Sequence, residues 1–180
     1  YEAAVIYLEG YLFDAPSGPD IFAKAAQIAA QSQSRIALSL SDSWCVDRHR
    51  NALRQFVTAH VDILFSNEDE ATSLIESDHP TSVEVLAGLV DEVVITRGPL
   101  GAVVCHNGQQ CSVDAMPQGA VVDTTGAGDL FAAGYLFGRL NNYDIRQSGE
   151  IASLLAGEVI SHIGARPQAD LQAFINRFID

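Results

Sequence analysis

The stretch Asp123-Thr-Thr-Gly-Ala-Gly-Asp129 is the strongest indicator of the fold, because a Gly-x-Gly turn is followed at once by an aspartate. An apolar Ala120-Val-Val122 precedes it, and an amphipathic run over residues 130–140 follows directly. This order predicts a strand, a tight glycine turn and a helix. The backbone amides of residues 126–128 would then lie free at a helix N-terminus, where the helix dipole also favours an anion. Asp129 falls in the first helical turn, beside that anion site.

The turn and its aspartate suit phosphoryl transfer. A carboxylate beside an anion hole can remove a proton from a hydroxyl while backbone amides stabilise charge on a phosphoryl group. The alternative is an ordinary helix start with an acidic residue in its first turn. The Gly-x-Gly-Asp pattern alone does not separate the two interpretations.

Composition limits the classes of protein to consider. A length of 180 residues with 48% hydrophobic residues predicts one domain with a substantial core. The net charge of −13 argues against binding to nucleic acid or to an anionic membrane, although a local anion hole can still bind an anionic ligand. The sequence has no signal peptide and no apolar run of membrane-spanning length, so a cytoplasmic location is expected.

The cysteines and the N-terminus carry two further expectations. Cys45, Cys105 and Cys111 show no CxxC or Cys/His metal spacing, so we expect free thiols in a reducing compartment. The chain begins at Tyr1 without a Met and enters an apolar run at residue 3. We therefore expect this sequence to be a segment of a longer protein.

Hydrophobic patterning predicts alternating strands and helices. Strands are predicted at residues 3–8, 35–40, 61–65, 92–96, 101–106 and 110–114, with the last two joined by the hairpin signal Asn107-Gly108. Helices are predicted at residues 20–33, 46–59, 68–75 and 82–88, and from 130 to the end with breaks near 141–142, 164–167 and before 170. The alternation predicts a mostly parallel sheet with helices on both faces, whose ligands bind beyond the carboxyl ends of the strands.

Asn67 and Glu70 follow the third predicted strand. Residues three apart share one face of a helical turn. An amide and a carboxylate there suit water-mediated binding of Mg²⁺ and phosphate, because Mg²⁺ prefers oxygen ligands and keeps several of its waters. An ordinary capped helix start is the alternative.

The segment Thr96-Arg-Gly-Pro-Leu-Gly101 follows the fourth predicted strand. Gly98 and Gly101 allow close approach of the backbone, and Thr96 and Arg97 are suited to phosphate oxygens. The alternative is a tight turn between strands.

Taken together, three segments resemble the PfkB family of carbohydrate and nucleoside kinases in their order and spacing: Asn67-x-x-Glu70, Thr96-x-Gly98-x-x-Gly101 and Asp123-Thr-Thr-Gly-Ala-Gly-Asp129. The resemblance implies a ribokinase-like α/β fold, a three-layer α/β/α sandwich with a mostly parallel central sheet. Residues 1–180 would form a single α/β domain, the C-terminal, ATP-binding and catalytic portion of such a kinase, with the N-terminal part and the lid missing.

The resemblance also implies a role for each matching residue. Asp129 resembles the catalytic base, and the backbone of Gly126, Ala127 and Gly128 resembles the anion hole for the γ-phosphoryl group. Asn67 and Glu70 resemble the pair that organises Mg²⁺ and the phosphates, with Glu70 reaching Mg²⁺ through water. Asp123 and Thr125 match a monovalent-cation site, usually for K⁺. The residues that resemble the ATP site are Thr96, Arg97, Gly98, Gly101, Ala156 and Val159.

The implied activity is an ATP-dependent phosphotransferase with an alcohol group as acceptor, acting on a small-molecule nucleoside or sugar. Ribokinase-like relatives commonly carry Asp-x-Asn-x-Arg after the second of these strands, whereas this chain has Asp42 without that pattern. We therefore expect adenosine or a related nucleoside first, then a ketohexose or other sugar as in fructokinases, and then ribose. Many relatives dimerise through the lid, which implies a homodimer for the full-length protein.

Two alternatives remain open. A dinucleotide-binding oxidoreductase also uses Gly-x-Gly at a helix start, but that fingerprint belongs in an early βαβ unit with an acid about 20 residues on. Here the turn comes late, and the region near residues 146–150 is predicted helical. The other alternative is a non-catalytic nucleotide-binding fragment of such a kinase.

Overall fold

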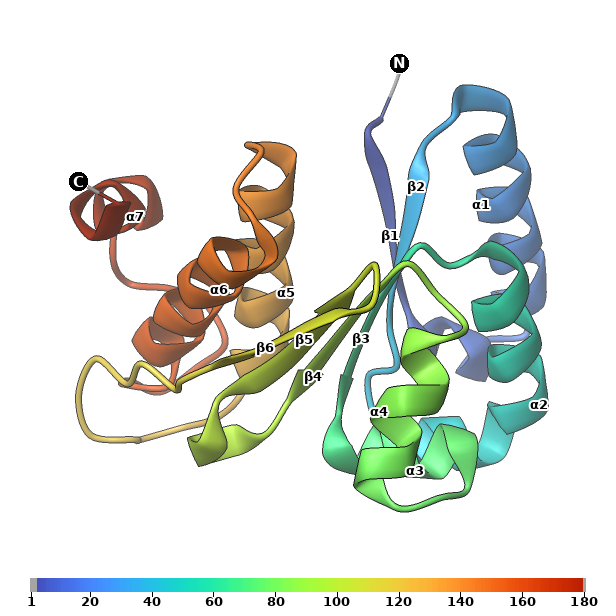
Figure 1. Ribbon diagram of the computed structural model, residues 1–180, viewed down its shortest axis with the longest axis horizontal. Coiled ribbons are helices and arrows are strands. Elements are labelled where there is room, and N and C mark those ends of the chain that lie inside the picture. The colour runs from blue at the N-terminus through green and yellow to red at the C-terminus, as the bar shows by residue number, and fades with distance from the viewer. Residues whose placement is uncertain (1–2, 180) are drawn as a thin grey trace. The chain divides into compact units, whose positions relative to one another are not determined.

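The computed structural model describes residues 3–179. In this range it has one six-stranded sheet with the strand order β1-β2-β3-β4-β5-β6, and seven α-helices (Figure 1). The strands are β1 Val5–Glu9, β2 Arg35–Ser39, β3 Ile63–Asn67, β4 Glu92–Thr96, β5 Ala102–His106 and β6 Gln109–Val113. The predicted α/β class is therefore confirmed.

The sheet is mostly parallel, as predicted. β1 pairs with β2 in parallel from Val5↔Arg35 to Glu9↔Ser39, and β2 pairs with β3 in parallel. Helical crossovers join these strands, which is the connection that parallel neighbours require. β5 and β6 are instead joined by Asn107 and Gly108, both with positive φ (50° and 73°), which is the predicted tight hairpin.

The chain packs as two compact units, Tyr1–Ile95 with Cys105–Gln109, and Thr96–Val104 with Gln110–Asp180. The helices of the first unit are the 3-10 helix η1 Gly10–Asp14 and the α-helices α1 Gly18–Ser32, α2 Ser43–His60, α3 Glu68–Ile75 and α4 His79–Ala87. Its aromatic core joins these elements. The ring of Phe22 lies 4.1 Å from that of Phe13 and 4.7 Å from that of Phe56, so the core links α1 to both η1 and α2.

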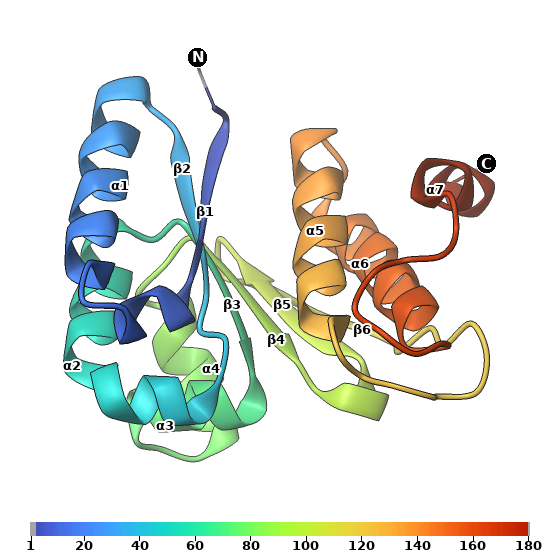
Figure 2. The ribbon, with the colours of Figure 1, turned by 180° about the vertical axis from the view of Figure 1, so that it is seen from behind.

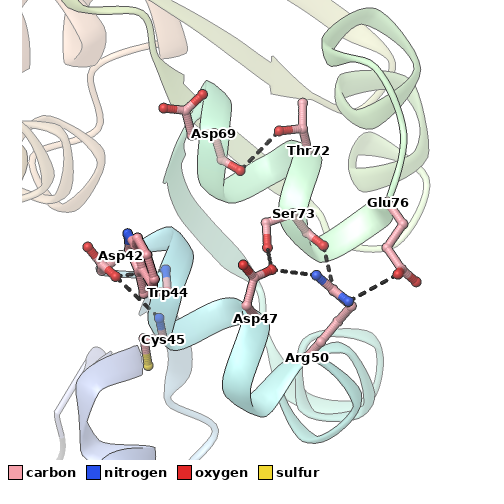
Figure 3. A network of polar contacts seen from close by, with 9 residues as sticks. All are labelled: Asp42, Trp44, Cys45, Asp47, Arg50, Asp69, Thr72, Ser73 and Glu76. Atoms are coloured by element: carbon pink, nitrogen blue, oxygen red, sulfur yellow. Dashed lines mark hydrogen bonds and ion pairs between the residues drawn. The ribbon is translucent and has the colours of Figure 1, made fainter.

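A polar network fastens α3 to α2 (Figure 3). Arg50 Nε donates to the carbonyl of Ser73 at 2.7 Å, Nη1 donates to Glu76 Oε1 at 3.0 Å, and Nη2 donates to Asp47 Oδ1. Ser73 Oγ also donates to Asp47 Oδ1, at 2.6 Å. The guanidinium therefore satisfies a carbonyl in the last turn of α3, where a cation also complements the helix dipole.

The second unit contains the 3-10 helix η2 Gly98–Leu100 and the helices α5 Ala127–Leu140, α6 Ile145–Val159 and α7 Leu171–Ile179 (Figure 2). α5 and α6 pack closely because α5 carries glycine at the contact. A Cβ on Gly134 would lie 2.7 Å from Ala152 Cα, and one on Gly138 would lie 2.7 Å from Ser148 Cα. The apolar core of this unit is built from Leu130, Ile151, Leu155, Val159 and Ile175.

The strand predicted at residues 120–122 does not form. Val121 and Val122 are 61% and 55% exposed, and the amide of Val122 donates to the carbonyl of Ile160 at 2.8 Å. This segment therefore bonds to the end of α6 and not to a neighbouring strand, although its apolar residues are typical of strands.

The other differences from the sequence prediction concern boundaries. α4 begins at His79 and not at residue 82, because the Asp78 side chain caps it by accepting from the amide of Thr81. α2 begins at Ser43 and not at residue 46, because Asp42 caps it in the same way. The predicted breaks after residue 140 and before 170 are confirmed. Over the described residues, none of the helices has the length and apolar character needed to cross a membrane.

Candidate functional site

A pocket of about 450 Å³ lies within the second unit. This volume is in the range of small-molecule sites. Six of the residues predicted to bind ATP or phosphate line it, and most of its remaining lining is apolar. The lining residues are Thr96, Gly98, Pro99, Gly101, Ala115, Met116, Pro117, Val121, Thr124, Ala127, Gly128, Phe131, Ser153, Ala156, Gly157 and Ile160.

Two glycines allow backbone segments to meet at the edge of the pocket. Gly101 has φ 79°, and a Cβ there would lie 1.9 Å from the carbonyl oxygen of Val113. A Cβ on Gly157, inside α6, would lie 1.8 Å from the carbonyl oxygen of Met116. Since real Cβ atoms never approach oxygen so closely, both positions require glycine for this packing.

The predicted glycine turn starts α5 at one side of the pocket. Gly126 is the N-cap with φ 82°, a left-handed conformation that favours glycine. The amide of Ala127 donates to the carbonyl of Thr124 at 3.1 Å, so it is bonded within the turn, whereas the sequence suggested that it lies free. Apart from its chain neighbours and the backbone of its own helix, no described heavy atom lies within 4 Å of a Cβ built on Gly128, so this residue faces open space. Asp129 follows it, exposed, in the first turn of α5.

Asp123 holds the start of the turn in place. Its Oδ1 accepts from the amide of Thr125 at 3.0 Å and from Thr125 Oγ1 at 2.7 Å, and its Oδ2 accepts from the amide of Gly164 at 2.9 Å. These hydrogen bonds, the one from the Thr125 hydroxyl first, lower the pKa of Asp123 to about 2. The structure therefore brings Asp123 and Thr125 together and keeps the carboxylate ionised.

The loop after α6 is held in place by the buried carboxylate of Glu158. Glu158 Oε1 accepts from the amides of Gln168 and Ala169, both at 2.9 Å. Ala165 of the same loop lies against Gly126, where an added Cβ would be 2.8 Å from Ala165 Cβ. Glu158, which the sequence analysis did not single out, thus fixes the segment that packs behind the glycine turn.

Asn67 and Glu70 form a reciprocal cap at the start of α3, in the first unit. Asn67 Oδ1 accepts from the amide of Glu70 at 2.8 Å, and Glu70 Oε2 accepts from the amide of Asn67 at 3.0 Å. Asn67 Nδ2 also donates to Glu70 Oε1 at 2.7 Å. The predicted pair therefore does share one face, and it also satisfies two orphan amides of the helix end.

The carboxyl group of Glu70 has an unusual protonation equilibrium. It is 6% exposed, and burial raises its pKa to about 7, against the lowering effect of the hydrogen bond from the Asn67 amide. The negative charges of Asp42, which caps α2, and of Glu9, at the end of β1, raise its pKa further. These carboxylates make the carboxyl ends of β1 to β3 a region that favours a cation.

Sequence reasoning identified part of the pocket. Arg97, Gly126, Asp129 and Val159 were predicted near a nucleotide but do not line the pocket, and Val159 is fully buried in the core. The lining residues that it missed include Met116, Pro117 and Phe131. A glycine inside a helical run, as at Gly157, is a usable signal of close packing. Residues 115–117 carry no such signal, because only the tertiary structure brings them to α6.

Comparison with known proteins places these features in a family. The pfkB family carbohydrate kinase pattern matches residues 1–171. The solved adenosine kinase from Sinorhizobium meliloti is 38% identical, with a TM-score of 0.94, over 97% of this chain and 54% of that protein. A probable sugar kinase from Rhizobium etli CFN 42 is 36% identical, with a TM-score of 0.94, over 98% of this chain and 54% of that one.

A curated relative gives a further comparison. The nucleoside kinase of Methanocaldococcus jannaschii is 28% identical over 113 residues, which are 61% of this chain and 36% of that enzyme. The chain thus spans about half the length of the two solved relatives, and its 113 matched residues span about a third of this enzyme. The match over residues 1–171 and the ribokinase-like fold show that the chain belongs to the pfkB family of carbohydrate kinases.

Proposed function

We propose that this chain is the ATP-binding and catalytic part of a kinase that transfers the γ-phosphoryl group of MgATP to a hydroxyl of a nucleoside, with adenosine favoured, or of a sugar. The observation that carries the proposal is the pocket whose lining includes Ala127 and Gly128 of the glycine turn. A ligand with an apolar face and an anionic end fits this pocket, because the walls are mostly apolar and the N-terminus of α5 lies at one side.

The pocket walls suit a purine base. Met116, Pro117, Phe131 and Ile160 offer apolar surface, and Thr96 adds a hydroxyl group. A flat aromatic base buries apolar area between such side chains. We assign Ala156, Gly98 and Gly101 to the same nucleotide site.

Asp129 is proposed as the catalytic base, and the backbone of residues 126–128 as the anion hole. Asp129 accepts the proton of the acceptor hydroxyl, the acceptor oxygen attacks the γ-phosphorus, and ADP leaves with the electrons of the broken bond. The Ala127 amide would exchange its hydrogen bond to the Thr124 carbonyl for one to the transferring group, and losing one such anion-hole donor typically costs roughly 10²–10³ in rate.

The residues present fit the two cations that the family uses. Glu70 would hold Mg²⁺ through water, with Asn67 beside it, because a buried carboxylate near Asp42 and Glu9 gains from a positive charge. Mg²⁺ would neutralise charge on the phosphates. Asp123 and Thr125 supply oxygens for a monovalent cation, K⁺, since Asp123 Oδ2 accepts one hydrogen bond and keeps a lone pair.

Adenosine is favoured over a sugar because the adenosine kinase from Sinorhizobium meliloti is 38% identical to this chain. The sugar alternative is supported by the probable sugar kinase from Rhizobium etli CFN 42, at 36% identity. The two sequence identities differ little, so an assay must decide which acceptor is used. A cytoplasmic location and a homodimer of the full-length protein stay predictions.

The test measures Mg²⁺-dependent formation of ADP from ATP by the protein in its natural length, with adenosine, other nucleosides, fructose and ribose as acceptors. Asp129→Asn should lower turnover by roughly 10²–10⁴ while ATP binding is retained. Asp170→Asn is the matched control, because Asp170 only caps α7 and asparagine caps equally well. Near-normal turnover in Asp129→Asn would exclude Asp129 as the base, and no turnover with any acceptor would favour a non-catalytic nucleotide-binding role.

A further inference from the structure

Three side chains with metal-binding atoms meet in the first unit, and the proposed kinase reaction uses none of them. Asp14 comes from η1, and Cys45 and His49 come from the first turns of α2. One carboxylate oxygen, the thiol sulfur and one imidazole nitrogen all lie within 4.8 Å of one another. We propose that this cluster binds one divalent transition-metal ion of the zinc class and thereby links η1 to α2.

The helix is shaped to bring the ligands together. Cys45 and His49 are four residues apart, so they lie on one face of α2. At His49 the backbone leaves helical geometry, with φ −119° and ψ 15°, so α2 is kinked at the residue whose ring reaches η1. His49 Nε2 lies 2.8 Å from Asp14 Oδ1, and its ring stacks on Phe13 with the centroids 5.7 Å apart. The stacking fixes the direction in which the imidazole points.

Neighbouring groups hold the other two ligands. The buried thiol of Cys45 donates to the carbonyl of Gly10 at 3.3 Å. Asp14 Oδ2 accepts from Arg48 Nη2 at 2.6 Å, and Oδ1 accepts from Arg48 Nε at 3.1 Å. These bonds from Arg48, and then the one from His49, lower the pKa of Asp14. Carboxylates that bind metals are commonly oriented in this way by a second hydrogen-bonding partner.

Binding requires a small shift of the side chains and a rearrangement of protons, because His49 Nε2 and Asp14 Oδ1 are 2.8 Å apart and must separate to about 3.3 Å to hold one tetrahedral ion between them. The metal ion takes the position between His49 Nε2 and Asp14 Oδ1, and the imidazole carries its proton on Nδ1. The Cys45 thiol gives up its hydrogen bond to the Gly10 carbonyl, releases that proton to solvent and binds as the thiolate. Arg48 keeps its bond to Asp14 Oδ2, so the carboxylate is held while Oδ1 binds the ion.

The donor set selects the class of metal. Sulfur, nitrogen and oxygen together suit Zn²⁺ or Co²⁺, whereas Mg²⁺ and Ca²⁺ prefer oxygen alone. Three protein ligands leave the fourth position of a tetrahedral ion to water. The side chains of Asp14 and His49 are 38% and 27% exposed, so the ion can enter from solvent, and Cys45 lies beneath them.

The test titrates chelator-treated protein with Co²⁺ and follows its absorption spectrum. We expect a thiolate-to-Co²⁺ charge-transfer band that saturates at one ion per chain and is displaced by Zn²⁺. Cys45→Ser should abolish this band, and His49→Gln and Asp14→Asn should weaken binding by about tenfold or more. Cys111→Ser and His60→Gln are the matched controls, since Cys111 belongs to the second unit and His60 lies in the last turn of α2.

A second readout is independent of the thiolate band. Zn²⁺ should raise the unfolding temperature of the wild-type protein, because an ion that binds only the folded state stabilises it, and this increase should be absent in His49→Gln. That variant replaces a partly exposed side chain, so it also serves if Cys45→Ser fails to fold. The proposal is overturned if no saturable band forms, if the band survives Cys45→Ser, or if Cys111→Ser removes it.

Discussion

Replacing Glu70 by glutamine should change how the stability of the protein depends on pH. The folded pKa of Glu70 is about 7 against an ordinary value of 4.5, chiefly because its carboxyl group is buried. The difference corresponds to on the order of 3 kcal/mol between the protonated and ionised forms. Below pH 4.5 both the folded and the unfolded chain keep this proton, and the stability linked to it is fully present.

As the pH rises from 4.5 through 7, the unfolded chain loses the proton first, so the free energy of unfolding of the wild-type protein falls. Glu70→Gln has no such proton and should not show this fall. The glutamine gives up one hydrogen bond to Asn67, at a cost of about 1 kcal/mol. The variant should therefore be less stable than the wild type by about 1 kcal/mol at pH 4 and more stable by about 2 kcal/mol at pH 8.

The measurement is urea-induced unfolding between pH 4 and pH 8, followed by circular dichroism. Glu84→Gln is the matched control, because Glu84 is exposed in α4 and its curve should run parallel to that of the wild type. The reasoning about the buried carboxyl group is refuted if the curve of Glu70→Gln also runs parallel to the wild-type curve.

Three further substitutions test the packing around the sites. Gly157→Ala should destabilise the protein by about 1–3 kcal/mol or more, because the new Cβ would lie 1.8 Å from the carbonyl oxygen of Met116, and ATP affinity should fall with it. Gly128→Ala should leave the unfolding temperature equal or higher, since its Cβ meets no described atom within 4 Å, but should lower turnover if the phosphoryl group passes there. Arg50→Ala should destabilise by about 1.5–3 kcal/mol, because the carbonyl of Ser73 loses a charged donor (Figure 3).

Calorimetric unfolding and ATP titration give both readouts for the two glycine variants. An unfolding temperature of Gly157→Ala equal to that of the wild type would contradict the close contact in α6. For Arg50→Ala the matched control is Arg54→Ala, one turn further along the same helix and exposed. An equal loss of stability in the two variants would show that the network around Arg50 contributes no more to stability than an exposed arginine does.

The sequence determined the class of the fold because local patterns carry it. Apolar runs at strand length, helical spacing between them and Asn107-Gly108 at the hairpin are properties of neighbouring residues, and all of these elements form. The glycine turn and the Asn67–Glu70 pair were also predicted, because both depend on residues fewer than five apart. The strand predicted at residues 120–122 is wrong, because the amide of Val122 donates its hydrogen bond to Ile160, about 40 residues further along the chain.

Tertiary structure decided which further residues share a site with the predicted ones. Met116 and Gly157 meet in the pocket wall because a helix and a loop pack with no room for a side chain, and no local pattern encodes which residue lies opposite that glycine. Burial raised the pKa of Glu70 to about 7, and burial is a property of the whole unit and not of the motif. Asp14 lies close to Cys45 and His49, although more than 30 residues separate them in the sequence. The kink in α2 at His49 is not predicted by the sequence. Short-range spacing thus determines the helices and strands. Contacts between residues far apart in the sequence depend on how these elements pack, so only the tertiary structure determines them.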